Sequence, residues 1–85
     1  MAYQIILDAV AEAGINALPA WVRPAVDEAM AVLEEVPWNG EPTSRGNPDG
    51  EVRRWLFGPE GAGMLTCLIV EHDREVHVLT IQWAG

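Results

Sequence analysis

Lysine is missing from this sequence, and its five basic residues are all arginine. They stand against 13 acidic residues, which gives a formal net charge of -8 at pH 7. Proteins bind nucleic acids largely by neutralising phosphates with lysine and arginine. The charge therefore argues against an extended nucleic-acid-binding surface and leaves room only for a local basic patch.

Cysteine occurs once, at Cys67, and no apolar run approaches the roughly 20 residues that a membrane-spanning helix needs. A single cysteine excludes an intrachain disulfide framework and a cysteine-rich zinc site. The N-terminal segment has no basic residue and reaches Asp8 too early for a secretory signal peptide. We therefore expect a cytoplasmic protein that is not embedded in a membrane. No motif in the sequence indicates a metal or another cofactor.

The apolar content is sufficient for one folded domain over residues 1–85, since 49% of the residues are hydrophobic. β-branched and apolar residues predict strands at residues 3–7, 52–57, 64–71 and 75–83. Short glycine-rich or polar turns separate the last three strands, which favours antiparallel pairing.

Two helices are predicted between the first and second strands. One begins after Asp8, which can act as its N-cap, and runs to about residue 17. Gly14 lowers the helix propensity of this segment. The other covers residues 22–36, where apolar residues recur every three or four positions, and Pro37 ends it. Residues 37–50 are rich in turn formers and predict a loop. The order β-α-α-β-β-β indicates an α+β fold, with two N-terminal helices packed on a small, mainly antiparallel sheet.

Several segments carry a resemblance to a known family. They are the opening Met1-Ala2-Tyr3, the helical Leu18-Pro19-Ala20-Trp21-Val22-Arg23, the long helix before Pro37, Arg45-Gly46-Asn47-Pro48-Asp49-Gly50, Val52-Arg53-Arg54-Trp55-Leu56, and the two final strands. In order and spacing the chain resembles a divergent member of the RelE/ParE toxin superfamily over nearly its whole length. The resemblance implies the toxin of a toxin–antitoxin pair, held silent by an antitoxin.

RelE-like members of that family cleave messenger RNA in the ribosome, whereas ParE-like members poison DNA gyrase. RelE-type chemistry uses basic side chains on the open face of the sheet. They hold the RNA backbone, help the 2′-hydroxyl attack the adjacent phosphate and stabilise the negative charge that develops.

By this resemblance, Arg53 and Arg54 are the candidate catalytic residues. Neighbouring strand residues point to opposite faces, so we expect one arginine on the open face and the other packed or paired with an acid. Further basic positions of the family correspond here to Met64 or Leu65 and to the end of the chain near Ala84. The basic set is therefore incomplete.

Arg45 and Trp55 are candidate substrate-binding residues, since arginine can contact phosphate and tryptophan can stack on a base or anchor a protein partner. His72, in a turn, and His77, in the last strand, are candidate acid–base residues because imidazole titrates near neutral pH. Each also has an ordinary interpretation as a solvated or packed side chain.

Three functions stay open, and with them the question of whether the chain is an enzyme. The first is a ribosome-dependent mRNA endoribonuclease, which the missing basic residues disfavour. The second is a catalytically inactive RelE/ParE-fold domain that binds a protein partner, and the third is a gyrase inhibitor. An antitoxin for this acidic chain should be unusually basic. The apolar last strand and Trp83 also predict a homodimer through an edge or face of the sheet.

Overall fold

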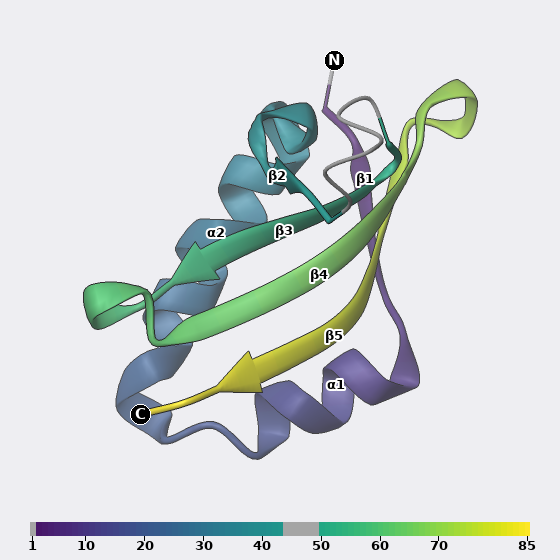
Figure 1. The fold of residues 1–85 in the computed structure, drawn as a ribbon. Helices are drawn as coiled ribbons and strands as arrows, with labels where there is room; N and C mark the ends of the chain where they lie inside the picture. The colour runs from purple at the N-terminus through teal and green to yellow at the C-terminus, as the bar shows by residue number, and fades with distance from the viewer. Residues whose placement is uncertain (1, 44–49) are drawn as a thin grey trace.

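The structure is a computed structural model, which describes residues 2–43 and 50–85. It contains one five-stranded sheet (Figure 1). Its strands are β1 (Gln4–Leu7), β2 (Glu41–Pro42), β3 (Val52–Phe57), β4 (Gly63–Val70) and β5 (Glu75–Trp83). They lie in the order β1-β5-β4-β3-β2, with β1 parallel to β5 and all other neighbours antiparallel. The first and last strands thus lie side by side.

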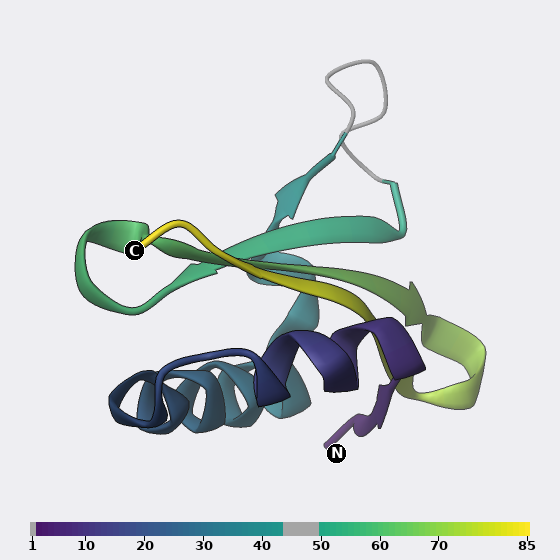
Figure 2. The same cartoon turned by 90° about the horizontal axis from the view of Figure 1, so that it is seen from below.

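Two helices, α1 (Ala9–Asn16) and α2 (Arg23–Glu35), cover a single face of this sheet (Figure 2). A short 3-10 turn, Ala20–Val22, precedes α2, and Pro24 lies in its first turn, where a missing N–H costs nothing. Within β4 the side chains alternate between fully buried and half-exposed, as expected for a strand covered on one side. Among the described residues, the opposite face carries no helix, and it is called the open face below.

The predicted α+β fold is confirmed. β3 and β5 have the predicted bounds, and the helices and remaining strands agree to within about two residues. The predicted loop at 37–50 was wrong in one respect, because it contains β2, whose residues Glu41 and Pro42 pair with Arg54 and Arg53. A strand of two residues is too short to show a periodic pattern, and one of the two is a proline, which is tolerated only in edge strands. β2 therefore could not be predicted from the sequence.

Gly14 explains how α1 approaches the sheet. A Cβ atom at this position would lie 2.5 Å from the carbonyl oxygen of Ile81 in β5. The glycine that weakens the helix is therefore what allows close packing on the strand. The N–H of Asp8 also donates to the carbonyl of Val78 at 3.0 Å, which fixes the start of α1 against β5.

The position of the last strand in the sheet bears on the expected self-association. β4 pairs with β5 along its length, and β1 and then α1 occupy the other side. The last strand is therefore an inner strand of the sheet, and a homodimer through an edge or a face of the sheet stays a prediction. Trp83 packs within the chain, at 5.8 Å from Trp21 and 6.4 Å from Phe57 between ring centroids.

The hydrophobic core fills the space between the helices and the covered face of the sheet. Its fully buried members include Leu33 of α2, Leu65 and Ile69 of β4, and Val76 of β5. Cys67 lies among them with no exposed surface, and this burial raises the pKa of its thiol to about 11. In the described part of the chain, no helix is both long and apolar enough to cross a membrane.

Candidate functional site

Arg54 lies on the open face of the sheet. It is opposite Thr66 of β4, which is in turn opposite Thr80 of β5, so one polar row crosses three strands. The guanidinium is 3.7 Å from the carboxylate of Glu41, with 44% and 80% of the two side chains exposed. Exposed ion pairs contribute little, so this one leaves Arg54 able to bind another anion.

Glu75 and His77 form a pair on the same open face. The two side chains are half-buried, and Nε2 of His77 lies 3.1 Å from Oε1 of Glu75. A carboxylate that accepts a hydrogen bond from Nε2–H orients the imidazole and leaves Nδ1 with a lone pair for proton transfer. His77 is opposite Leu68 of β4, two positions along that strand from the residue opposite Arg54. Arg54 on β3 and the Glu75–His77 pair on β5 thus lie on either side of β4, and His77 is offset from Arg54 by two residues along that strand.

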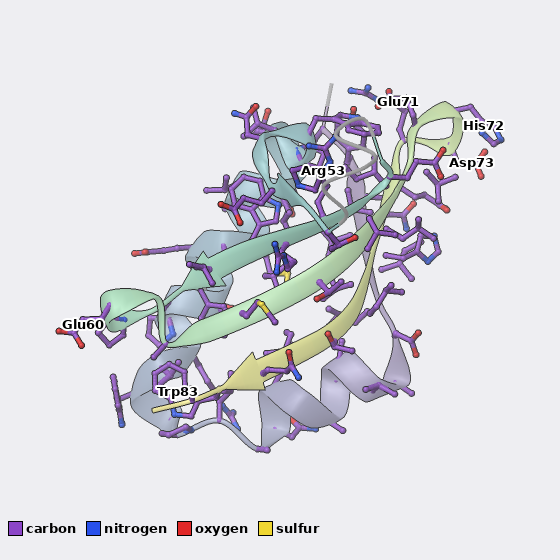
Figure 3. All side chains as sticks on the ribbon, in the orientation of Figure 1. Arg53, Glu60, Glu71, His72, Asp73 and Trp83 are labelled. Atoms are coloured by element: carbon purple, nitrogen blue, oxygen red, sulfur yellow. The ribbon has the colours of Figure 1, made fainter. Side chains whose placement is uncertain are left out.

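His72 lies apart from this group. It sits in the turn between β4 and β5, and its imidazole pairs with Asp73 at 3.2 Å while facing solvent (Figure 3). The structure therefore does not bring His72 and His77 together. Arg45, the expected loop contact to substrate, falls in residues 44–49, outside the described residues.

Arg53 lies on the helix-covered face, opposite the buried Cys67 of β4, and is only 8% exposed. Its Nε donates to the carbonyl of Gly50 at 2.9 Å, and an Nη donates to the carbonyls of Gly40 at 3.1 Å and Trp38 at 3.4 Å. The guanidinium also lies 5.0 Å from the centre of the Trp38 ring. Arg53 thus joins the end of the connection between β2 and β3, at Gly50, to the segment that precedes β2. To act as a catalytic residue on the open face it would have to leave these carbonyls.

A second polar cluster, which sequence reasoning missed, surrounds Glu71 in the turn after β4. Its Oε1 accepts from the hydroxyl of Tyr3 and from Nε1 of Trp38, both at 2.6 Å, and its Oε2 accepts from Arg74 at 2.8 Å. These three hydrogen bonds lower the pKa of Glu71 to about 2, with the largest effect from Tyr3, followed by Trp38 and then Arg74.

The same bond to Glu71 raises the pKa of Tyr3, and Arg74 lies 4.0 Å over the Tyr3 ring. The cluster ties the N-terminal segment and the turn that follows α2 to the turn between β4 and β5. Each of its members reads as an ordinary surface residue in the sequence, so no periodicity or motif could have found it.

Trp55 of β3 packs against the backbone of Gly40, where a Cβ atom would lie 2.3 Å from its Nε1. This Nε1 is buried, and no described atom of the chain accepts its hydrogen bond. Trp55 also lines a cleft of about 410 Å³, together with Gly40, Glu41, Arg54, Leu56 and Met64. A buried donor without an acceptor is costly, and this one is enclosed against Gly40.

Comparison with known proteins finds a likeness of fold. The chain matches no family model and no curated protein, so the likeness is structural. It is 16% identical to a chain of the intact Escherichia coli RelBE toxin–antitoxin complex, covering 99% of each chain at a TM-score of 0.79. For the RelBE2 toxin–antitoxin complex of Mycobacterium tuberculosis the identity is 21%, the coverage is 98% of this chain and 99% of that one, and the TM-score is 0.78.

A free mutant of the E. coli RelE toxin is similar as well, with 22% identity, coverage of 100% of this chain and 86% of that one, and a TM-score of 0.77. The chain has the RelE fold. The expected resemblance is thereby confirmed for the architecture.

Within this RelE fold, the positions that the resemblance assigns to further basic residues are apolar. Met64 is half-exposed beside Arg54, and Leu65 is completely buried on the helix side. Across residues 2–43 and 50–85, the open face therefore presents Arg54 and the Glu75–His77 pair as its candidate chemistry. No group of three potential metal ligands occurs in those same residues.

Proposed function

We propose that this chain is the toxin-type partner of a cytoplasmic toxin–antitoxin pair, and that its principal activity is to bind an antitoxin protein. The observation that carries this proposal is the full-length likeness to RelE chains solved as complexes with RelB. These come from E. coli, M. tuberculosis and Pyrococcus horikoshii, the last at a TM-score of 0.66 and 15% identity.

The charge of the chain supports a basic partner. With a net charge of -8, the surface attracts a protein rich in lysine or arginine and repels an acidic one. Binding should therefore weaken as salt screens these charges.

A two-hybrid screen of a genomic library from the source organism tests the proposal, because it does not depend on toxicity. We expect a small basic protein that co-purifies with the chain and suppresses any growth arrest that the chain causes on induction. A folded chain that causes no arrest and selects no such partner would contradict the proposal.

Endoribonuclease activity is a second candidate, favoured by the position of Arg54 and the Glu75–His77 pair on the open face. In this scheme Nδ1 of His77 takes the proton of an RNA 2′-hydroxyl, and the oxygen attacks the adjacent phosphorus. A 2′,3′-cyclic phosphate forms, the bond to the 5′-oxygen breaks, and that oxygen takes a proton from solvent. Arg54 holds the phosphoryl oxygens while negative charge develops on them.

The apolar residue Met64 and the inward-facing Arg53 limit such activity. Each missing donor costs about 3 kcal/mol of transition-state stabilisation, so cleavage should be slow. Cleavage of ribosome-bound message by the purified chain should fall about 10²-fold in His77→Ala. Arg54→Ala should fall comparably, while His72→Ala, a histidine outside the site, should stay unchanged. Wild-type protein without any cleavage would reject this candidate.

Inhibition of DNA gyrase is the third alternative. It would give growth arrest with intact messenger RNA and a loss of supercoiling by purified gyrase. Those two measurements together separate it from RNA cleavage.

A further inference from the structure

A hollow of about 300 Å³ lies between β1 and the two helices. Its apolar walls come from β1, α1 and α2, through Ile5, Leu7, Ile15, Val26 and Met30. β1 and β2 are the two outer strands of the sheet (Figure 1), so the hollow lies at the other end of the sheet from the Arg54–Glu41 pair. It is therefore separate from the candidate site on the open face.

The walls of the hollow are only partly covered by the protein itself. Ile5, Ile15 and Met30 are half-buried against the core, and Leu7 is 39% exposed. Sites for small molecules have volumes from about 300 Å³ upwards and are mostly apolar, with a few polar groups that orient the ligand. The hollow thus has room for one small molecule with an apolar part.

Two opposite charges complete its lining. Arg23 and Asp27 both line the hollow from α2, where residues four positions apart are neighbours on one side of the helix. The guanidinium and the carboxylate nevertheless form no ion pair with each other, and neither forms one with another residue of the described chain. Both charges are therefore available to a ligand.

These charges select the class of ligand. A guanidinium binds a carboxylate through charge-assisted hydrogen bonds, and a carboxylate binds an ammonium group in the same way. Since Arg23 and Asp27 are about one helical turn apart, the two charged groups of the ligand must lie close together. A free α-amino acid carries both groups on one carbon atom, whereas a peptide separates them by at least one amide unit. An apolar side chain on that carbon supplies the part that covers the walls.

We propose that this hollow binds a free α-amino acid with an apolar side chain of about the size of leucine. Arg23 holds the carboxylate, Asp27 holds the ammonium group, and the apolar side chain lies against Ile5, Ile15 and Met30. Both charged residues are exposed, so each contributes little, and we expect a Kd of about 1 mM. This binding is separate from the proposed function and does not require an antitoxin.

The test is an NMR titration of the labelled full chain with L-leucine. We expect saturable shifts of the methyl signals of Ile5, Ile15 and Met30. Two analogues each lack one charge, since 4-methylpentanoate has no ammonium group and 3-methylbutylamine has no carboxylate. Each analogue should bind about three- to fivefold more weakly than L-leucine, because it leaves one charged residue without a partner.

Substitutions in α2 assign each charge to its residue. Asp27→Asn should weaken L-leucine binding about three- to fivefold without weakening 4-methylpentanoate, which has no group for this carboxylate. Arg23→Gln should weaken L-leucine by a similar factor without weakening 3-methylbutylamine. The matched control is Glu28→Gln, which removes the neighbouring acid of α2. Glu28 lines a different cleft, so this variant should bind L-leucine as the wild type does.

Three results would overturn the inference. They are no saturable binding of L-leucine by the folded wild type, equal affinities for L-leucine and both analogues, and shifts that lie outside the hollow. A partner from the two-hybrid screen that shifts the same methyl signals, in a chain that does not bind L-leucine, would assign the hollow to the protein interface. That outcome rejects the amino-acid site and leaves the proposed function intact. Binding of L-leucine by a chain that selects no partner and causes no growth arrest would do the reverse.

Discussion

Arg53 and Arg54 are adjacent in the sequence and lie on opposite faces of the sheet. Arg53 bonds to the carbonyls of Gly50 and Gly40 on the covered side, while Arg54 faces outward beside Glu41. A strand turns successive side chains to opposite sides, so two identical residues meet different environments. One arginine therefore stabilises the fold, and the other is the candidate for chemistry.

Replacing these two arginines should separate stability from function. Arg53→Ala leaves buried carbonyls without donors and should lower the free energy of unfolding by about 2–3 kcal/mol. Arg54→Ala removes one exposed ion pair and should change it by less than about 0.5 kcal/mol. Urea denaturation measures both values, and equal losses would contradict the assignment.

The Glu71 cluster should make stability depend on acid pH. Three donors hold the pKa of Glu71 at about 2, below its ordinary value of 4.5, so the folded state favours the ionised form. Its contribution is fully present above pH 4.5 and should be lost as the pH falls towards 2. In Glu71→Gln, the unfolding free energy should be lower at neutral pH and should fall less steeply across this window. Parallel pH profiles for the two proteins would reject this role.

Gly14→Ala should destabilise the protein although alanine favours helices. Alanine improves helix propensity by about 1 kcal/mol, but an added carbon beside the Ile81 carbonyl costs about 1–3 kcal/mol through overpacking. We expect a net loss of about 1 kcal/mol, seen as a lower melting temperature. Glu12→Ala, on the exposed side of α1, is the control and should be nearly neutral. A stabilised Gly14→Ala would mean that α1 does not press on β5.

Cys67 should be inert in the folded protein. Burial raises the pKa of its thiol to about 11, so the reactive thiolate is scarce at pH 8 and shielded from reagents. A thiol reagent such as dithionitrobenzoate should label it only when urea unfolds the chain. Rapid labelling of the native protein would show that this part of the core opens.

The periodic parts of the chain were the predictable ones. The apolar repeat of α2 and the alternating strands β3 and β5 identify their own structure and length, because the buried face must recur with the geometry of the element. β2 and the Glu71 cluster could not be predicted in this way. They depend on partners far along the chain, such as Arg54 for Glu41 and Glu71 for Trp38, and nothing local in Glu41 or Trp38 marks the contact.

The candidate site was predictable only in its residue types. The sequence alone determined the shortage of basic residues, the α+β order of elements and the alternation that must separate Arg53 from Arg54. Only the tertiary structure decided which of the two faces outward and that Glu75 lies within hydrogen-bond distance of His77. Composition and periodicity are properties of a single chain segment, whereas faces, edges and pairings exist only after distant segments have packed together.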